Sequence, residues 1–217
     1  MSARKTKSDR IGLKDAYGLQ TPEDSRALYA KWAENYDEDF VAAHDYTYHS
    51  AISRLLVAHL DPAIKVPRIL DIGCGTGLVG EALHALLPAA RIDGMDISPE
   101  MLGAAKKKGV YDQLLEVDLT RAGSIPAGYD GIVSSGIFTH GHLGPEVLDT
   151  IVDAGDLFVL GINAELFTSA GFDKTFDALT SAGKISDLRY ETGRIYEEGA
   201  SHDHADARFQ AAIFRAA

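Results

Sequence analysis

The stretch RILDIGCGTGLVG, Arg68–Gly80, decides how the chain folds. It begins as an apolar strand, 68–73, and continues as a helix, 78–87, with glycines at the junction: Gly73, Gly75, Gly77 and Gly80. Glycines between a strand and a helix let the backbone turn sharply and let a ligand touch the main chain. The stretch therefore predicts a strand–loop–helix unit whose loop binds a ligand.

The same order of strand and helix recurs along the chain. Strands are predicted at 68–73, 91–97, 112–119, 129–136 and 155–163, and helices at 78–87, 99–108, 144–154 and around 174–183. Such alternation favours a parallel sheet that is covered on both faces. Two further strands, 184–196 and 205–216, flank a polar loop and predict a hairpin. The expected fold is α/β: a Rossmann-like, doubly wound, mostly parallel seven-stranded sheet with a C-terminal antiparallel β-hairpin.

The residues before the first strand are predicted to be mostly helical. Thr21 can cap a helix that carries Leu28, Trp32 and Tyr36 on one face, and a second helix follows around 46–60. We expect a flexible tail, 1–20, and a single domain, 21–217, in which 21–62 is helical and 66–217 forms the α/β core.

Composition excludes several classes of partner. The formal net charge is −11, so the chain repels nucleic-acid phosphates, and the basic run Lys106–Lys108 is interpreted as the solvated end of a helix. No apolar run approaches the ~20 residues that cross a bilayer. The only cysteine, Cys74, fits a reducing cytoplasm. We expect a cytoplasmic protein that binds neither nucleic acid nor membrane, whether as a monomer or as a homodimer.

The glycine loop allows more than one ligand. A P-loop is excluded because its lysine is missing. The dinucleotide fingerprint G-x-G-x-x-G fits literally at Gly75, Gly77 and Gly80, and Asp96 follows where an acid would bind the ribose. An NAD(P)-dependent oxidoreductase is therefore one interpretation.

Three aspartates support a different interpretation. Asp71 precedes the glycines, and Asp96 and Asp118 end the second and third predicted strands. With these acids, DIGCGTG resembles the most recognisable motif of the class I S-adenosylmethionine-dependent methyltransferases, and the resemblance extends over 67–163. It implies S-adenosyl-L-methionine as cofactor and S-adenosyl-L-homocysteine as product. Because this cofactor is cationic and has no phosphate, nearby carboxylates are favourable.

The resemblance also assigns cofactor contacts. The amino-acid end would lie against Asp71, Gly73, Cys74, Gly75, Gly77, Ser134 and Ser135. Asp96 would accept hydrogen bonds from the ribose hydroxyls, and Ile97 and Met101 would pack on the adenine. Asp118 would accept from the adenine amino group, and the Leu119 N–H would donate to the ring.

The helical segment resembles the lid of small-molecule members of this superfamily. A tyrosine–aspartate pair, here Tyr36 and Asp37, sits over the cofactor in those proteins, and Trp32 and Tyr29 precede it by one and two turns. Aromatic faces attract a sulfonium through cation–π interactions. Packing against the core explains Trp32 equally well.

The acceptor is expected to bind near GIFTHGHL, 136–143, where the active site of the family opens. A histidine there can take a proton near neutral pH, so His140 and, on the lid, Tyr36 are the catalytic candidates, with His142 close by. This segment and the lid are similar to the methyltransferase-like subfamily named for the Williams–Beuren syndrome region. No metal is expected, since HDH at 202–204 is more typical of a solvated loop than of a zinc site.

The sequence as a whole favours a methyltransferase that acts on a small-molecule acceptor. The alternatives are the oxidoreductase and a non-catalytic protein that binds S-adenosylmethionine.

Overall fold

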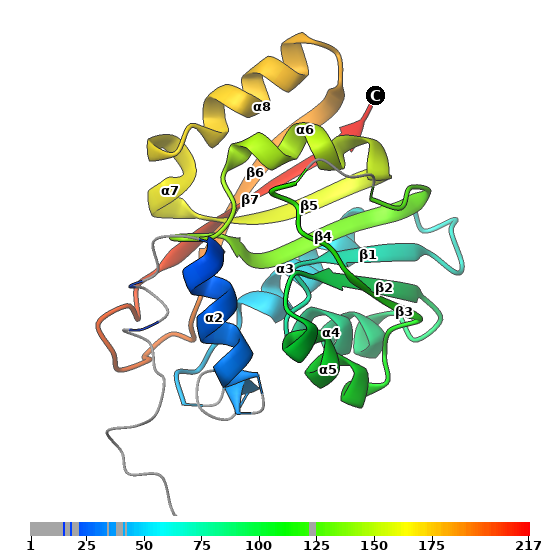
Figure 1. Cartoon of the computed structure of the whole chain (residues 1–217). Helices are drawn as coiled ribbons and strands as arrows, with labels where there is room; N and C mark the ends of the chain where they lie inside the picture. Colours follow the sequence, from blue (N-terminus) through cyan, green and yellow to red (C-terminus); the bar gives the residue numbers. More distant parts are fainter. Residues whose placement is uncertain are drawn as a thin grey trace, which may run out of the picture.

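The computed structural model describes residues 15, 18, 22–33, 35–37, 41, 43–121 and 125–217. Most of the predicted tail and the predicted cap Thr21 lie outside these residues. A seven-stranded sheet with the order β3-β2-β1-β4-β5-β7-β6 forms the centre (Figure 1). Its strands are β1 (Arg68–Ile72), β2 (Arg91–Asp96), β3 (Gln113–Glu116), β4 (Tyr129–Phe138), β5 (Gly155–Asn163), β6 (Ile185–Arg194) and β7 (Arg208–Ala216).

The pairing of the strands confirms the predicted topology. The first five strands pair in parallel, whereas β7 is antiparallel to both β5 and β6. The strand order reverses between β1 and β4, and in open α/β sheets ligands bind at the carboxyl ends of strands beside such a reversal. The fold therefore places the glycine loop after β1 at the expected binding edge.

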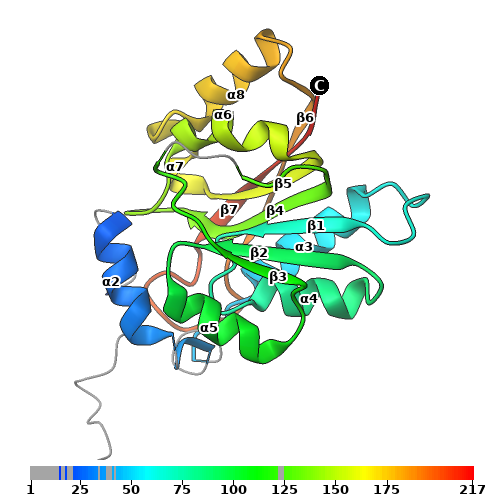
Figure 2. The same ribbon diagram turned by 45° about the vertical axis from the view of Figure 1, so that its right-hand side comes forward.

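Helices cover both faces of the sheet, as Figures 1 and 2 show. One face carries α3 (Tyr48–His59), α4 (Leu78–Leu86) and α5 (Pro99–Lys108), and the other carries α6 (Leu148–Ile151), α7 (Ala164–Ser169) and α8 (Phe172–Ser181). In β1, Ile69 packs with the first layer, and Leu70 and Ile72 pack with the second. This alternation follows from the two-residue period of a strand. Within the described part of the chain, no helix has both the length and the apolar character that crossing a membrane requires.

Two predicted helices differ from the observed ones. The helix α2 (Pro22–Trp32) ends before Tyr36, because a turn follows in which the Asn35 N–H donates to the Trp32 carbonyl. The predicted helix 144–154 is a short α6 between two 3₁₀ turns, Pro145–Val147 and Val152–Ala154.

The ends of two strands also depart from the prediction. The strand β3 stops at Glu116, so Asp118 lies in the following loop rather than at a strand end. There its carboxylate accepts from the Thr120 N–H at 3.0 Å, a local bond that competes with strand pairing. In β4 the register shifts between Ser134 and Phe138, where Gly136 has a φ of +87°.

Candidate functional site

An open cavity of about 220 Å³ lies at the carboxyl ends of the central strands. Its walls come from the glycine loop, the residues after β2, β3 and β4, the lid segment, the start of α3 and the residues after β6. Figures 1 and 2 show α2 at this edge of the sheet. We call the part over β1–β3 the nucleoside end and the part over β4, β5 and the hairpin the acceptor end.

The glycine loop follows the conformation that its sequence requires. Gly73, Gly75 and Gly77 have φ values of +70°, +54° and +94°, a region that other residues adopt only with strain. A Cβ on Gly73 would overlap the Ile137 side chain, whereas a Cβ on Gly75 would meet no atom within 4 Å. The open space beside Gly75 is where a ligand can approach the main chain.

Asp96, at the end of β2, is an acceptor on the wall that the backbone holds in place. The Gly75 N–H donates to its Oδ2 at 3.0 Å and the Ser98 N–H donates to its Oδ1 at 2.9 Å. Each carboxylate oxygen can accept a second hydrogen bond. Burial raises the pKa of Asp96, and these backbone donors counteract the rise. The carboxylate is thus fixed in position and able to accept from a pair of hydroxyls.

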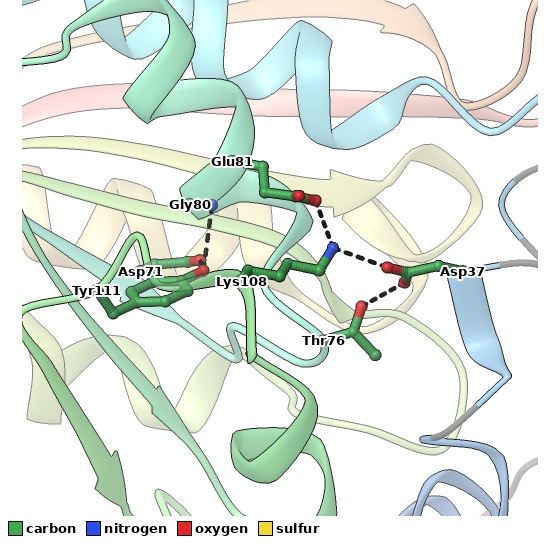
Figure 3. Close-up of polar contacts among 7 residues, drawn as sticks. All are labelled: Asp37, Asp71, Thr76, Gly80, Glu81, Lys108 and Tyr111. Atoms are coloured by element: carbon green, nitrogen blue, oxygen red, sulfur yellow. Dashed lines mark hydrogen bonds and ion pairs between the residues drawn. The ribbon is translucent and has the colours of Figure 1, made fainter. Parts of the chain in front are cut away.

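Asp71 lies beneath the loop instead of on the wall. Its Oδ2 accepts from the Tyr111 hydroxyl at 2.7 Å, and its buried Oδ1 has no partner among the described residues (Figure 3). Burial raises the pKa of Asp71 to about 7, although the Tyr111 hydrogen bond lowers it; the charge of Asp96 adds to the rise. Asp71 therefore titrates near neutral pH below the ligand loop.

Tyr111 also explains the third glycine of the literal dinucleotide fingerprint. Its hydroxyl accepts from the Gly80 N–H at 3.1 Å (Figure 3). A Cβ on Gly80 would overlap the Tyr111 ring. Gly80 therefore serves packing, which is also the role of the third glycine in the dinucleotide fingerprint. Sequence reasoning missed Tyr111, since only the fold brings the segment before β3 against α4.

The predicted adenine contacts share one part of the wall: Ile97, Met101, Asp118 and Leu119. The Asp118 carboxylate is already engaged by its own loop. Thr120 donates to Oδ1 through its N–H and hydroxyl, and the Arg121 Nε lies 3.0 Å from Oδ2.

Asp37 joins the lid segment to the glycine loop. Its carboxylate accepts from the Thr76 hydroxyl at 2.6 Å and lies 2.7 Å from the Lys108 Nζ (Figure 3). Lys108 also forms an ion pair with Glu81 on α4. We call these four residues the latch. The sequence predicts a solvated helix end at Lys108, but the Lys108 side chain is only 13% exposed, because it lies against the carboxylates of Asp37 and Glu81.

Four of the predicted site residues lie off the cavity wall: Trp32, Asp71, Gly77 and Ser134. Trp32 is buried behind the two lid tyrosines that do reach the wall, Tyr29 and Tyr36, and its ring centre is 5.0 Å from that of Tyr36. Burial raises the pKa of Tyr36 well above its usual value. The Tyr36 hydroxyl thus stays protonated at neutral pH and is a hydrogen-bond donor, not a proton acceptor.

The acceptor end gathers side chains from distant segments. Sequence reasoning missed several of them, because no local pattern links them: Tyr46, Tyr48, His49, Asn163 and Tyr196. Ser135 also lies on this wall, and its buried Oγ has no partner among the described residues. The HDH loop is less solvated than predicted, since His202 packs edge-on against Tyr196 with ring centres 4.4 Å apart.

The two candidate histidines differ in their surroundings. His140 is 39% exposed, and its Nε2 lies 3.8 Å from a Glu165 oxygen. His142 is more enclosed, and burial lowers its pKa. Its ring centre lies 5.5 Å from that of Tyr29.

The residues on the wall fit S-adenosylmethionine, the cofactor that the motif implies. Gly75 leaves room for a ligand at the main chain, and Asp96 offers free lone pairs to a ribose. The unpartnered Ser135 hydroxyl and the lid tyrosines suit the polar and cationic groups of the methionine part.

Comparisons with known proteins agree with this geometry. The family model described as a methyltransferase domain matches residues 69–154. The chain is 34% identical over 110 residues to human methyltransferase-like protein 27, covering 48% of this chain and 42% of that protein. It is 32% identical over 115 residues to an uncharacterized methyltransferase of Bacillus pumilus, covering 52% and 53%. The chain thus spans about half the length of these curated relatives.

Solved structures share the fold along nearly the whole chain. A plantazolicin methyltransferase in complex with a triazolic desmethylPZN analog and SAH has a TM-score of 0.61 at 16% identity, covering 94% of each chain. A TehB-like SAM-dependent methyltransferase from Corynebacterium glutamicum has a TM-score of 0.58 at 22% identity, covering 90% of this chain and 100% of that chain.

Proposed function

The chain belongs to the class I S-adenosylmethionine-dependent methyltransferase superfamily, and on this premise we propose that it transfers a methyl group from S-adenosylmethionine to a small-molecule acceptor. Asp96 carries the proposal. Its carboxylate is held by two backbone N–H groups beside the open space at Gly75, as a ribose-binding acid requires.

The cofactor would bind along the nucleoside end. We assign the ribose hydroxyls to Asp96, the adenine to Ile97, Met101 and Leu119, and the methionine part to the glycine loop and Ser135. The lid tyrosines Tyr29 and Tyr36 would face the sulfonium.

S-adenosylmethionine supplies, when bound, a methyl group on a positively charged sulfur. The chain then has to hold the acceptor atom in line with that methyl group and to exclude water. Such orientation contributes roughly 7–11 kcal/mol to lowering a barrier. The acceptor end, between the lid and the loop after β4, is the place for this task.

The oxidoreductase interpretation has lost its distinctive support. The matching family model and the relatives are methyltransferases, and the sheet ends in the antiparallel pair β6–β7, which is not the usual end of a plain dinucleotide-binding domain. A non-catalytic cofactor-binding protein is the second candidate, since the nucleoside end alone would serve it. We further propose a cytoplasmic location and the single-domain arrangement with a tail and a helical lid; placement in the Williams–Beuren-region subfamily stays a prediction.

Calorimetric titration tests the cofactor. We expect S-adenosylmethionine to bind and NAD not to bind. Asp96→Ala should weaken binding at least tenfold, because hydrogen bonds to a charged group contribute about 1.5–3 kcal/mol. Asp112→Ala is the matched control, since Asp112 is exposed and off the cavity wall. Binding of NAD alone, or equal affinities in all three proteins, would overturn the assignment.

Methyl transfer from radiolabelled S-adenosylmethionine to an extract of small metabolites separates an enzyme from a binder. Labelled product is expected from the natural chain. Cofactor binding without any labelled product would favour the non-catalytic candidate.

A further inference from the structure

The loop after β4 holds His142 in a fixed place on the acceptor wall. The backbone N–H of His142 donates to the Thr139 carbonyl at 3.1 Å, and the backbone N–H of Leu143 donates to the Ile137 carbonyl at 3.1 Å. The backbone on both sides of the histidine is therefore tied into a turn. A general base needs such positioning, because proton transfer requires hydrogen-bond reach.

The hydrogen bonding of His142 determines which ring nitrogen carries the proton. Its Nδ1 lies 2.9 Å from the His140 carbonyl oxygen. A carbonyl oxygen only accepts, so Nδ1 must carry a hydrogen, and in the neutral ring Nε2 then has a free lone pair. Among the described residues Nε2 has no hydrogen-bond partner, since the only side-chain hydrogen bond of His142 is the one at Nδ1. The ring thus presents an unused proton acceptor.

Burial of His142 favours the neutral form of its ring. Burial lowers the pKa of His142, and the hydrogen bond to the His140 carbonyl offsets part of this effect. Tyr29 of α2 is in ring contact. The other titratable groups on the cavity wall are Tyr36, Tyr46, Tyr48, His49, Cys74, Asp96, Asp118, His140 and Tyr196.

We propose that His142, and not His140, is the general base of the reaction, a proposal that rests on the methyltransferase function above. Nε2 takes the proton of an acceptor X–H group, where X is oxygen, nitrogen or sulfur. The electron pair of X forms the bond to the methyl carbon, and the carbon–sulfur bond breaks with its electron pair left on sulfur. The imidazolium then releases its proton to solvent.

The wall of the acceptor end narrows the class of acceptor. Besides His142 it presents aromatic rings and apolar side chains, with a few polar groups between them: Tyr46, Phe138, Tyr196, Ile137 and Ile195 beside Tyr48, His49, Ser135, Thr139, His140 and Asn163. Such a wall favours a flat, largely apolar molecule, since burying a charge there would be costly. The acceptor is therefore an aromatic compound with a weakly acidic phenol, thiol or ring N–H.

Nitrogen-15 NMR of the histidine rings tests the base without any cofactor or acceptor. The His142 signal is assigned by its loss in His142→Gln. We expect the Nδ1–H tautomer and a midpoint below the ordinary value of about 6.5. An Nε2–H tautomer, or a midpoint above the ordinary value, would overturn the proposal.

The kinetic test uses the extract fraction that supports methyl transfer. The rate of the natural chain should rise with pH through the His142 midpoint, because the base must be unprotonated. His142→Gln should lower the rate about 10²- to 10⁴-fold and abolish that rise. His84→Gln, on the exposed side of α4, is the matched control. It should keep the rate of the natural chain and the rise of that rate with pH. Loss of the rise in His140→Gln or His49→Gln instead would reject His142.

Ion exchange at pH 7 tests the acceptor class. Methyl-accepting activity should pass through both cation- and anion-exchange resins, as expected of an uncharged aromatic compound. Retention on either resin would refute the acceptor class. If no fraction accepts a methyl group, the proposed function itself fails, while the NMR result still decides the state of His142.

Discussion

The two ends of the cavity are built in different ways. The nucleoside end is positioned by main-chain geometry: two left-handed glycines on its wall, Gly73 and Gly75, and a carboxylate held by two backbone N–H groups. The acceptor end consists of side chains from α2, the start of α3, the loop after β4 and the residues after β6. One end is thus fixed by two short segments of sequence, and the other exists only after distant segments have packed.

This difference explains where sequence reasoning succeeds. A glycine loop after a strand and an acid at the end of the next strand are local patterns, and parallel strands bring them together. Tyr46 and Tyr196, by contrast, meet through an isolated bridge between segments 150 residues apart. No local sequence pattern predicts the contact between these two tyrosines.

The largest expected effect lies where the two ends touch, at Gly73. Gly73→Ala should lower the free energy of unfolding by about 2–5 kcal/mol, because the left-handed φ is strained and the new Cβ overlaps Ile137 of the acceptor end. Gly75→Ala is the matched control, with the same strain but open space, and should cost about 1–2 kcal/mol. Urea unfolding measures both. Equal losses would contradict the contact with Ile137.

A smaller effect is expected beneath the nucleoside end, at Asp71. The folded pKa of about 7 exceeds the ordinary 3.8, so the native state keeps a proton that the unfolded state releases. The contribution of Asp71 to stability therefore decreases as pH rises from about 4 to 7, by at most roughly 4 kcal/mol at ~1.4 kcal/mol per pKa unit.

Asp71→Asn removes this titration. In urea unfolding from pH 4.5 to 8, the free energy of the natural chain should fall relative to that of the variant as pH rises. Parallel curves for the two proteins would show that Asp71 titrates normally.

The smallest effect is expected at the latch, which joins the lid to the nucleoside end. Lys108→Met removes the ion pairs with Asp37 and Glu81. The cost should be about 1 kcal/mol or less, since both carboxylates are partly exposed and the pairs are screened.

Trp32 reports the state of the lid, because it is the only tryptophan and is buried at the end of α2. Acrylamide should quench its fluorescence more in Lys108→Met than in the natural chain, and 1 M salt should reduce the difference. Lys107→Met is the control, since Lys107 is exposed. Identical quenching in all three proteins would mean that the latch does not hold the lid.

The sequence predicted the fold class well and the polar network poorly. Alternating strands and helices sufficed for the sheet and its terminal hairpin. The three lysines 106–108 carry identical chemistry, however, and only the end of α5 places Lys108 between Asp37 and Glu81. Likewise, His142 differs from His140 because its Nδ1 contacts a backbone carbonyl and its ring is more buried. Neither difference can be predicted from the sequence.

The shifted register at the end of β4 has a consequence for how such a protein diversifies. Between Ser134 and Phe138, four steps along β4 match two along β5, so the strand has already left regular pairing where the loop of His142 begins. Insertions or exchanges in this loop beyond Phe138 then need not disturb the pairing of β1 with β2. The side chains that face the acceptor can therefore be exchanged without changing the strand that carries Asp96.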